Sequence, residues 1–320
     1  MTPRAFITGV AGQDGGYLTE LLLSKGYEVF GLIGPDPEAR ERCESRWPSG
    51  FTALDGDLTD MSSLQSAVQL AKPDEVYNLA AQSWVGLSWE DALATTEINA
   101  MGVLRLLEVV KAACPDARFC QASSADMFGV SDHEMLSETS CIRPRSPYGA
   151  AKAYGHFITV NYRESYGMHA CSAIMFNHES PRRPLNFVTR KITDGAARIK
   201  LGLAQHLELG NMDVARDWGF AGDYVRAMWM MMQAEDADDY IIATGVTHTV
   251  RDLCERAFAH VGLDYREYVR PDERFMRPAE IEVLAADVTK ARTVLGWEPQ
   301  VTFDELIGMM VDADMERLAG

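Results

Sequence analysis

The sequence predicts an α/β protein in which helices cover both faces of a doubly wound parallel sheet, with a smaller α/β domain at the C-terminus. A glycine-rich turn, residues 9–16, separates a short apolar run from a segment with helical periodicity. Apolar runs and helical segments then alternate as far as residue 176, which is the pattern of successive β-α-β units. Tyr148 and Lys152 follow one of these runs and share one face of the next expected helix.

The bulk composition is that of an ordinary globular protein, since 47% of the 320 residues are apolar and 24% are charged. The net charge of -17 predicts repulsion from nucleic acids and anionic membranes. The 6 cysteines show no C-x-x-C spacing, so we expect free thiols, a reducing compartment and no metal site. Because the chain has neither an apolar run of about 18 residues nor a signal-peptide pattern at its start, we expect a cytoplasmic protein.

The first unit consists of an expected strand at residues 4–8, the glycine turn and an expected helix at residues 17–25. Gly9 permits the tight turn, Gly12 lets the backbone approach a phosphate, and Gly15 allows close packing of the helix on the strand. The N-terminus of the helix favours negative charge. This arrangement is typical of the Rossmann dinucleotide-binding fold, so we interpret the turn as a pyrophosphate site.

The next expected strand, residues 27–33, ends at the position that discriminates between NAD and NADP. A carboxylate there accepts hydrogen bonds from a free ribose 2′-hydroxyl, and Asp36 therefore points to NAD. Arg40, Arg42 and Arg46 follow and could instead reach a 2′-phosphate. A solvated proline-rich loop without a cofactor role is the alternative for all four residues.

Further units are expected from strands at residues 51–54, 76–83 and 118–124 and from helices at residues 61–71 and 99–113. Residues that follow such strands lie at the carboxyl edge of the sheet, where ligands bind. We expect Asp57 and Leu58 beside an adenine. The end of the strand at 76–83 is expected to contact the cofactor and the substrate entrance through Leu79, Ala80, Ala81, Gln82 and Ser83.

Tyr148 and Lys152 form a candidate acid/base pair. A phenol is a poor base at neutral pH, but a nearby ammonium group and a positively charged nicotinamide would both lower its pKa. The hydroxyls of Ser123 and Ser124 end the strand at 118–124 and are expected to face the same crevice. An ordinary helix face is the alternative for the pair, and the glycine turn is what favours hydride-transfer chemistry.

The second half is expected to continue the helix of Lys152 to about residue 166, followed by a strand at 170–176, a helix at 187–202, a strand at 206–209 and a loop at 210–219. A helix at 224–233, a strand at 240–243, a helix at 253–260, a strand at 281–284 and two helices starting near 287 and 303 complete the chain. Several cations in this half are candidates for binding a diphosphate, with solvated surface positions as the alternative: Arg182, Arg183, Arg190, Lys191, Arg216 and Arg277.

Motifs along nearly the whole chain resemble the extended short-chain dehydrogenase/reductases, and among them the GDP-mannose 4,6-dehydratase family. The resemblance rests on residues 8–15, 77–83, 144–149, 158–167, 176–183, 187–191, 216–219, 243–245 and 277–280. It implies a dinucleotide-binding Rossmann domain that contains the Tyr/Lys helix, mainly residues 1–176. It also implies a nucleotide-sugar-binding domain, mainly residues 177–320, with some chain interchange between the two.

The same resemblance implies roles for individual residues. Ser124, Asp126, Tyr148 and Lys152 would be catalytic. Gln13 and Asp14 would join the cofactor site, together with His178 near the nicotinamide, whereas Arg40 is a cofactor candidate only through its position after the second strand. The nucleotide-sugar site would comprise Ser83 and Ser88 in the sugar pocket, with Ser124, Asn177, Val188, Lys191, Gly210, Arg216, Arg277 and Glu280.

Two places depart from the family pattern. Ser124 and Asp126 stand where family members have threonine and glutamate, so each functional group is kept but Asp126 is one methylene shorter. Residues 34–37 replace an Arg-Arg-Ser-Ser segment that in the family recognises the 2′-phosphate and contributes to tetramer contacts. The resemblance therefore implies NADP(H), whereas the replacement and Asp36 favour NAD(H), and a homodimer and a homotetramer both stay open.

The function implied by the resemblance is conversion of GDP-mannose to GDP-4-keto-6-deoxymannose. Tyr148 would take the proton of the sugar 4-hydroxyl as hydride leaves C4, and Asp126 would take the C5 proton and protonate the departing 6-hydroxyl before hydride returns to C6. One alternative is a nucleotide-sugar 4-epimerase or 4-keto reductase, which needs no carboxylate at position 126. Another is a dinucleotide-binding sensor or scaffold, which would need none of Ser124, Tyr148 and Lys152.

Overall fold

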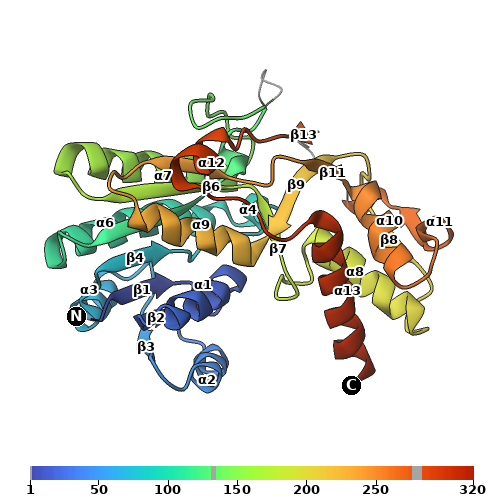
Figure 1. The fold of residues 1–320 in the computed structure, drawn as a ribbon, viewed down its shortest axis with the longest axis horizontal. Coiled ribbons are helices and arrows are strands. Elements are labelled where there is room, and N and C mark those ends of the chain that lie inside the picture. Colours follow the sequence, from blue (N-terminus) through green and yellow to red (C-terminus); the bar gives the residue numbers. More distant parts are fainter. Residues whose placement is uncertain (1, 131–134, 276–282) are drawn as a thin grey trace.

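A parallel sheet of 7 strands forms the centre of the molecule, in the order β3-β2-β1-β4-β5-β6-β10 (Figure 1). The structure is a computed structural model that describes residues 2–130, 135–275 and 283–320. The order reverses between β1 and β4, which opens the crevice where such sheets bind ligands. The predicted parallel sheet is thereby confirmed, and its strands are β1 (Arg4–Thr8), β2 (Glu28–Ile33), β3 (Phe51–Asp55), β4 (Glu75–Asn78), β5 (Arg118–Ser124), β6 (Ala170–Met175) and β10 (Asp239–Ile242).

Helices cover both faces of this sheet because successive strand residues point to opposite sides. Ala5 and Ile7 belong to one buried cluster, whereas Phe6 belongs to the other. The first face is covered by α1 (Gln13–Ser24), α2 (Pro37–Arg46), α9 (Ala221–Gln233) and α12 (Thr289–Leu295). The second face is covered by α3 (Met61–Ala71), α6 (Gly102–Ala113) and α7 (Pro147–Tyr166).

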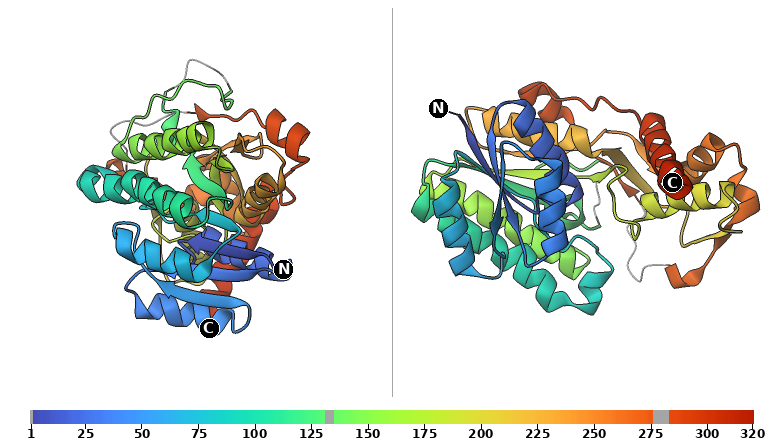
Figure 2. Two further views of the ribbon diagram at one scale, coloured as in Figure 1. Left: turned by 90° about the vertical axis from the view of Figure 1, so that its left-hand side faces the viewer. Right: turned by 90° about the horizontal axis from the view of Figure 1, so that it is seen from below.

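A smaller lobe lies beside the sheet and is built from later parts of the chain (Figure 2). Its core joins three helices, α8 (Val188–Lys200), α10 (Val250–His260) and α13 (Phe303–Ala319). A small sheet is centred on β9 (Ala215–Phe220), which pairs with β7 (Asn177–Glu179), β11 (Thr247–Thr249) and β13 (Val283–Leu284). The remaining elements of this lobe are β8 (Leu207–Leu209) paired with β12 (Val269–Pro271), α11 (Tyr265–Tyr268) and the 3₁₀ turn Glu273–Phe275.

Several element boundaries agree closely with the sequence predictions. The helix expected at 61–71 is α3, the strand expected at 118–124 is β5, and α7 ends at Tyr166. The strand expected at 76–83 is shorter, because β4 ends at Asn78 and the following residues curve along the sheet edge. The helix expected at 99–113 begins earlier, since α4 (Leu87–Glu90), α5 (Ala92–Thr96) and a π-helical turn (Glu97–Met101) precede α6.

Two loop predictions were wrong. A loop was expected at residues 210–219, yet residues 215–220 form β9, although Arg216 and Asp217 interrupt the apolar pattern. The Asp217 carboxylate is buried and accepts hydrogen bonds from the backbone nitrogens of Thr244 (2.8 Å) and Gly245 (2.7 Å), so a distant segment satisfies it. The alternative of a proline-rich loop after β2 was also wrong, because Asp36 caps α2 and Pro37 occupies its first turn.

The second half of the chain returns to the central sheet through β10. Arg163 on α7 donates to both carboxylate oxygens of Asp239 on β10, at 2.9 and 2.8 Å, and Asp239 also accepts from the backbone nitrogen of Ser172 at 3.0 Å. Both side chains are largely buried, with 18% and 14% exposed. This ion pair therefore ties the seventh strand to the helix that carries Tyr148.

Replacing Asp239 by alanine is expected to lower the free energy of unfolding by about 3 kcal/mol, because it leaves a largely buried guanidinium unpaired. Urea unfolding monitored by circular dichroism measures the difference. Asp213→Ala is the matched control, because Asp213 and its partner Arg251 are both exposed and such a pair contributes about 0 to 1 kcal/mol. Equal losses in the two variants would contradict the assigned role of Asp239.

Candidate active site

One cavity of about 640 Å³ opens at the carboxyl ends of the sheet strands, between the sheet and the smaller lobe. It brings together residues from both halves of the chain, as the sequence analysis expected of most of them. No helix in residues 2–130, 135–275 and 283–320 is long and apolar enough to cross a membrane, and no group of three candidate metal ligands occurs in those ranges. The predicted residues that line the cavity are Gly9, Gly12, Gln13, Asp14, Gly15, Asp36, Asp57, Leu58, Leu79, Ala80, Ala81, Gln82, Ser83, Ser123, Ser124, Asp126, Tyr148, Lys152, Asn177, His178, Arg183, Val188 and Arg216.

The glycine turn forms a backbone cradle that side chains would fill. Gly9 has φ of +71°, and a Cβ there would lie 2.8 Å from the Ala80 nitrogen. A Cβ on Gly15 would lie 2.3 Å from the Gly9 carbonyl oxygen. The turn leads directly into α1, whose N-terminal amide groups favour an anion. This arrangement fits the pyrophosphate of a dinucleotide.

Tyr148 and Lys152 are fixed by the start of α7. Ser146 caps this helix by accepting from the Gly149 nitrogen at 3.0 Å. Gly149 lets the helix approach the next segment closely, since a Cβ there would lie 2.7 Å from the Asp126 carbonyl oxygen. One turn later, Lys152 Nζ donates to the Ala122 carbonyl at 2.9 Å and lies 5.8 Å from the centre of the Tyr148 ring. The helix thus sets the tyrosine and the lysine against the end of β5.

Burial dominates the electrostatics of this pair. Burial raises the pKa of Tyr148 and the negative charge of Asp126 raises it further, against a smaller opposing effect of the hydrogen bond with Ser124. Burial also lowers the pKa of Lys152 to about 8. In the protein alone the pKa of Tyr148 is therefore raised, and the predicted phenolate depends on Lys152 acting together with a positively charged nicotinamide. The hydrogen bond with Ser124 and the charge of Arg183 lower the pKa of Tyr148, and a positively charged ring beside the phenol would lower it further.

Ser124 and Asp126 lie at the end of β5, where the strand turns into a short 3₁₀ segment (Ala125–Met127). Ser124 Oγ accepts from the Asp126 nitrogen at 3.2 Å and lies 3.4 Å from the Asp126 carboxylate. The same hydroxyl takes part in the hydrogen bond with Tyr148. Ser124 therefore connects the carboxylate and the phenol on one side of the cavity.

His178 contacts the start of α1 from the other lobe. Its Nδ1 lies 2.8 Å from the Phe176 carbonyl oxygen and its Nε2 lies 2.9 Å from an Asp14 carboxylate oxygen, so both nitrogens donate only as an imidazolium. Burial lowers the pKa of His178, but the charge of Asp14 and its hydrogen bond outweigh burial and raise the pKa overall. Burial likewise raises the pKa of Asp14, and His178 outweighs it and lowers the pKa overall.

The pair of Asp14 and His178 is expected to stabilise the fold only between these two displaced pKa values. The raised pKa of His178 gives stability that is complete below the unfolded-state value of ~6.5 and is lost as pH rises through the folded-state pKa. The lowered pKa of Asp14 gives stability that is present above ~3.9 and is lost as pH falls through its folded-state value. Thermal unfolding of wild type and Asp14→Asn should differ most near pH ~6 and less at higher pH. A difference that stays constant with pH would argue against an ionised pair.

Some predicted residues lie elsewhere. Ser88 is fully buried and donates to the Val85 carbonyl at 2.6 Å, outside the cavity, because the short helix α4 turns it inward. Arg40, Lys191 and Gly210 also lie outside the cavity lining, and Lys191 Nζ lies 3.3 Å from the centre of the Phe275 ring. Arg277 and Glu280 lie outside the described residues.

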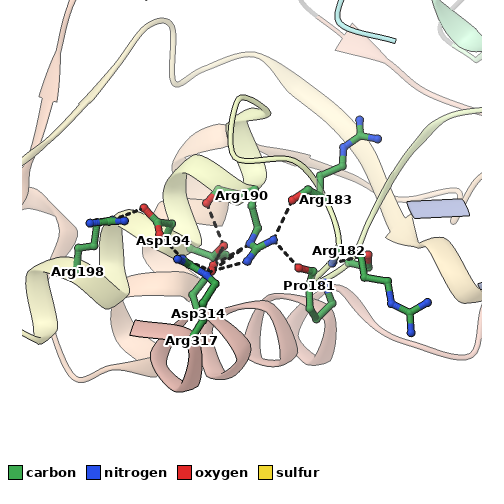
Figure 3. Close-up of polar contacts among 10 residues, drawn as sticks. Pro181, Arg182, Arg183, Arg190, Asp194, Arg198, Asp314 and Arg317 are labelled. Atoms are coloured by element: carbon green, nitrogen blue, oxygen red, sulfur yellow. Dashed lines mark hydrogen bonds and ion pairs between the residues drawn. The ribbon is translucent and has the colours of Figure 1, made fainter. Parts of the chain in front are cut away.

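Two of the predicted diphosphate ligands are instead bound to carboxylates. Arg182 donates to both carboxylate oxygens of Glu20 at 3.0 Å. Arg190 is buried and pairs with Asp314 at 2.6 Å (Figure 3). The diphosphate prediction is therefore wrong for these two arginines. Of the other candidates, Arg183 and Arg216 do reach the cavity.

Several residues that line the cavity were not predicted from the sequence. Trp84 stands at its surface with 39% exposed, and Asn186 and Phe187 line it from the segment before α8. Glu179 lines it too; it is almost fully buried, accepts from Thr189 Oγ1 at 2.5 Å and pairs with Arg183 at 3.1 Å. Glu179 is the last residue of β7, and its pairing with Arg183 depends on the turn that follows, so no local pattern in the sequence reveals this pair.

Known proteins resemble the chain over nearly its whole length. The family model described as "GDP-mannose 4,6 dehydratase" matches residues 6–310. GDP-mannose 4,6 dehydratase 2 of Arabidopsis thaliana is 50% identical over 98% of this chain and 87% of its own length. GDP-mannose 4,6-dehydratase of Vibrio cholerae is 43% identical over 99% and 95%.

Solved structures resemble the chain in the same way. The UDP-glucose 4-epimerase of Thermus thermophilus, in complex with NAD, has a TM-score of 0.84 at 29% identity and covers 97% of this chain and 98% of its own. The dTDP-glucose 4,6-dehydratase of Streptomyces venezuelae, with NAD bound, has a TM-score of 0.88 at 24% identity and covers 99% and 98%. At this sequence identity, the similarity to the Streptomyces venezuelae structure shows a shared fold and nothing more.

The parallel sheet, the glycine turn and the Tyr148–Lys152 helix define an extended short-chain dehydrogenase/reductase. The family match and the sequence identity to the two dehydratases narrow this class to one family. The chain belongs to the GDP-mannose 4,6-dehydratase family.

Proposed function

We propose that this protein is a nucleotide-sugar 4,6-dehydratase that converts GDP-mannose to GDP-4-keto-6-deoxymannose. The observation that carries the proposal is the presence of an acid/base tyrosine, its lysine, a serine and a carboxylate in the cavity that also contains the glycine turn. A carboxylate near the tyrosine serves proton transfer at C5 and O6, which epimerisation does not require. Membership of the family supports the choice of GDP-mannose.

In this proposal Tyr148 and Asp126 carry out different proton transfers. A nicotinamide bound in the cavity supplies the hydride acceptor for C4 and the hydride donor for C6. Tyr148 takes the proton of the sugar 4-hydroxyl, and Ser124 orients both the phenol and that hydroxyl through its hydrogen bonds. Asp126 then removes the proton at C5, which the 4-ketone acidifies, and passes it to the departing 6-hydroxyl, which leaves as water. As hydride returns to C6, C5 takes up a proton derived from solvent, and Tyr148 releases the proton of the 4-hydroxyl to solvent. The net change is the loss of one water molecule from the sugar.

Incubation of the purified protein with GDP-mannose in deuterated water tests this function. We expect mass spectrometry to detect the loss of water and proton NMR to detect one solvent deuteron at C5. An unchanged mass with inversion at C4 would instead identify a 4-epimerase. A protein that binds a nicotinamide cofactor but leaves every sugar nucleotide unchanged would correspond to the sensor or scaffold alternative.

For the cofactor, we propose NAD(H) in preference to NADP(H). Asp36 lines the cavity at the end of β2, where a carboxylate accepts from a free 2′-hydroxyl and repels a 2′-phosphate. Arg40 is held by Asp55 at 2.5 Å and Glu44 at 2.9 Å. The other two candidate arginines also face carboxylates, since Arg46 pairs with Glu20 and Arg42 lies between Asp36 and Glu38.

This preference is expected to appear as a dissociation constant for NADH at least about tenfold below that for NADPH, measured by cofactor fluorescence. Asp36→Asn removes the negative charge. It should bring the dissociation constants for NADH and NADPH closer together, chiefly by improving NADPH binding. Asp55→Asn, which loosens Arg40 outside the cavity, should improve NADPH binding as well. Tighter binding of NADPH by the wild type would refute the proposal.

We also propose that the protein is a homodimer, rather than the homotetramer that the family resemblance left open. Large apolar side chains are exposed along α5, the π-helical turn and α7, namely Leu93 with 87%, Phe157 with 51% and Met101 with 36% exposed. Covering such a surface with a second copy would remove it from water. Light scattering after size-exclusion chromatography would detect the dimer, and Phe157→Glu should dissociate it.

We further propose that the two lobes bind different ligands. Residues 1–176 would bind mainly the dinucleotide, and residues 177–320 mainly the nucleotide sugar. The return of α9, β10 and α12 to the central sheet supports the proposed interchange between them.

A further inference from the structure

Trp84 is a large aromatic side chain at the surface of the cavity, and no step of the proposed mechanism uses it. It is 39% exposed and lines the cavity together with Ser83 and Val85. The end of the neighbouring strand contributes small and polar side chains to the same cavity, among them Ser124 and Asp126. A wide apolar ring beside a few polar groups is typical of a site in which apolar surface supplies affinity and the polar groups set orientation.

The turn that carries Trp84 is held by a buried network behind it. Asn99, in the π-helical turn, accepts from the Gln82 backbone nitrogen at 2.9 Å and donates to the Gln82 carbonyl oxygen at 2.8 Å. The Gln82 side chain donates to Thr95 Oγ1 at 3.1 Å and accepts from the Trp84 backbone nitrogen at 2.6 Å. Asn99 and Thr95 are both buried. Contacts within the protein therefore fix the main chain of Trp84.

The indole ring of Trp84 packs against Gly86, the residue that precedes α4. A Cβ on Gly86 would lie 3.2 Å from Nε1 and Cε2 of the indole and 3.3 Å from its Cζ2. The backbone of Gly86 has φ of -57° and ψ of -48°, which other residues adopt readily, so the glycine provides space here and not an unusual conformation. The ring therefore has a defined position at the edge of the cavity.

The position of this turn along the sheet edge indicates which part of a ligand Trp84 meets. Its strand, β4, lies between β1, which leads into the glycine turn, and β5, which ends in the catalytic residues. After β4 the chain first touches the glycine turn through Ala80. It then continues to α4 and the π-helical turn, both of which pack on α7. Trp84 thus lies beyond the pyrophosphate site, on the side of the helix that carries Tyr148.

The hexose is the part of a nucleotide sugar that must reach this side of the cavity, because Tyr148 and Ser124 act on its 4-hydroxyl in the proposed mechanism. The nucleoside is separated from this end by the length of the diphosphate. A pyranose ring carries C–H groups between its hydroxyls, and these groups form apolar patches on the sugar. An indole offers a large and rigid apolar surface to such a patch.

We propose that Trp84 is a specificity-determining residue that packs against the hexose of the nucleotide sugar. Its contact favours the glycosylated nucleotide over the nucleoside diphosphate alone. This inference rests on the proposed function for the identity of the sugar. It adds that the turn after β4 supplies affinity for the hexose and none for the nucleotide.

The test compares GDP-mannose with GDP in a Tyr148→Phe background with NADH bound, where the missing phenol and the reduced cofactor both prevent turnover. In that background Trp84→Ala should raise the dissociation constant for GDP-mannose about tenfold, as expected for the loss of one large apolar contact. The dissociation constant for GDP should change less than about twofold. Calorimetry measures both constants, and circular dichroism verifies the fold.

Trp89→Ala is the matched control, because Trp89 on α4 is 56% exposed and does not line the cavity. It should leave both dissociation constants unchanged. Gly86→Ala tests the position of the ring, since the added methyl group would displace the indole. It should raise the dissociation constant for GDP-mannose about threefold, and in a double-mutant cycle it should have no further effect once Trp84 is alanine.

An equal rise for GDP and GDP-mannose in Trp84→Ala would show that the indole supports the turn or contacts the nucleotide, and would overturn the proposal. Unchanged affinities would overturn it as well, and so would a Gly86→Ala effect that persists without the indole. By contrast, the expected pattern of binding together with a wild type that does not dehydrate GDP-mannose would overturn only the proposed function.

Discussion

Replacing Tyr148 by phenylalanine is expected to lower kcat for dehydration by about 10²- to 10⁴-fold, the usual contribution of a positioned acid or base. The phenol is buried and hydrogen-bonded to Ser124. Among the described residues of α7, Tyr148 is the only one that brings a hydroxyl into this cavity, and the substitution removes that hydroxyl. The substitution keeps the ring that packs near Lys152. Steady-state kinetics with GDP-mannose, together with a thermal unfolding curve, measures the effect.

Binding supplies the control for Tyr148→Phe. The dissociation constants for NADH and GDP should stay within a few-fold of wild type, because the phenol hydroxyl acts on the sugar and not on the nucleotide. Retention of more than about a tenth of the wild-type kcat would mean that another group takes the proton. Tyr154→Phe, on the exposed face of the same helix, should have no comparable effect.

Replacing Asp126 by asparagine is expected to abolish net dehydration while the first hydride transfer persists. The amide keeps the size of the side chain but cannot take the C5 proton. We therefore expect a loss of about 10²-fold or more in turnover. With substrate deuterated at C4, the label should still be transferred to the cofactor, which mass spectrometry of the released cofactor detects. Full turnover in this variant would remove the reason for calling the protein a dehydratase.

Asp126→Glu is the matched variant, because it restores the longer side chain of the family pattern. A displacement of about 1 Å at a reacting group can cost about 10²-fold in rate. If the main chain around Ala125–Met127 has adjusted to aspartate, glutamate should lower turnover. If it has not, glutamate should raise it. In either case the carboxylate should keep far more activity than the amide.

Much of the fold could be predicted because its information is local. The glycine turn, the alternation of strands and helices, and the four-residue spacing of Tyr148 and Lys152 each depend on neighbouring residues. The strand β9 could not be found in this way. Its Arg216 and Asp217 look like loop residues until the backbone of Thr244 and Gly245 satisfies the carboxylate, and that pairing is set by the tertiary structure.

In the candidate site, too, some residues could be predicted from local sequence and others depend on the tertiary structure. Residues at strand ends, such as Ser124 and Asn177, fall in the cavity because the sheet edge places them there. Arginines carry no such constraint, since a long side chain can turn to either side of its element. Arg183 faces the cavity, whereas Arg190 reaches away to a helix 124 residues later, and only the position of Asp314 decides this.

The return of β10 and α9 to the central sheet has a consequence for how the protein is made. Met228, Met231 and Met232 of α9 are fully buried in the core cluster that also contains Leu18 and Leu22 of α1. A nascent chain leaves the ribosome from its N-terminus, so α1 emerges long before the methionines that cover it. The first lobe therefore cannot complete its core until α9 (Ala221–Gln233) and β10 (Asp239–Ile242) have been synthesised, and until then its apolar face stays exposed.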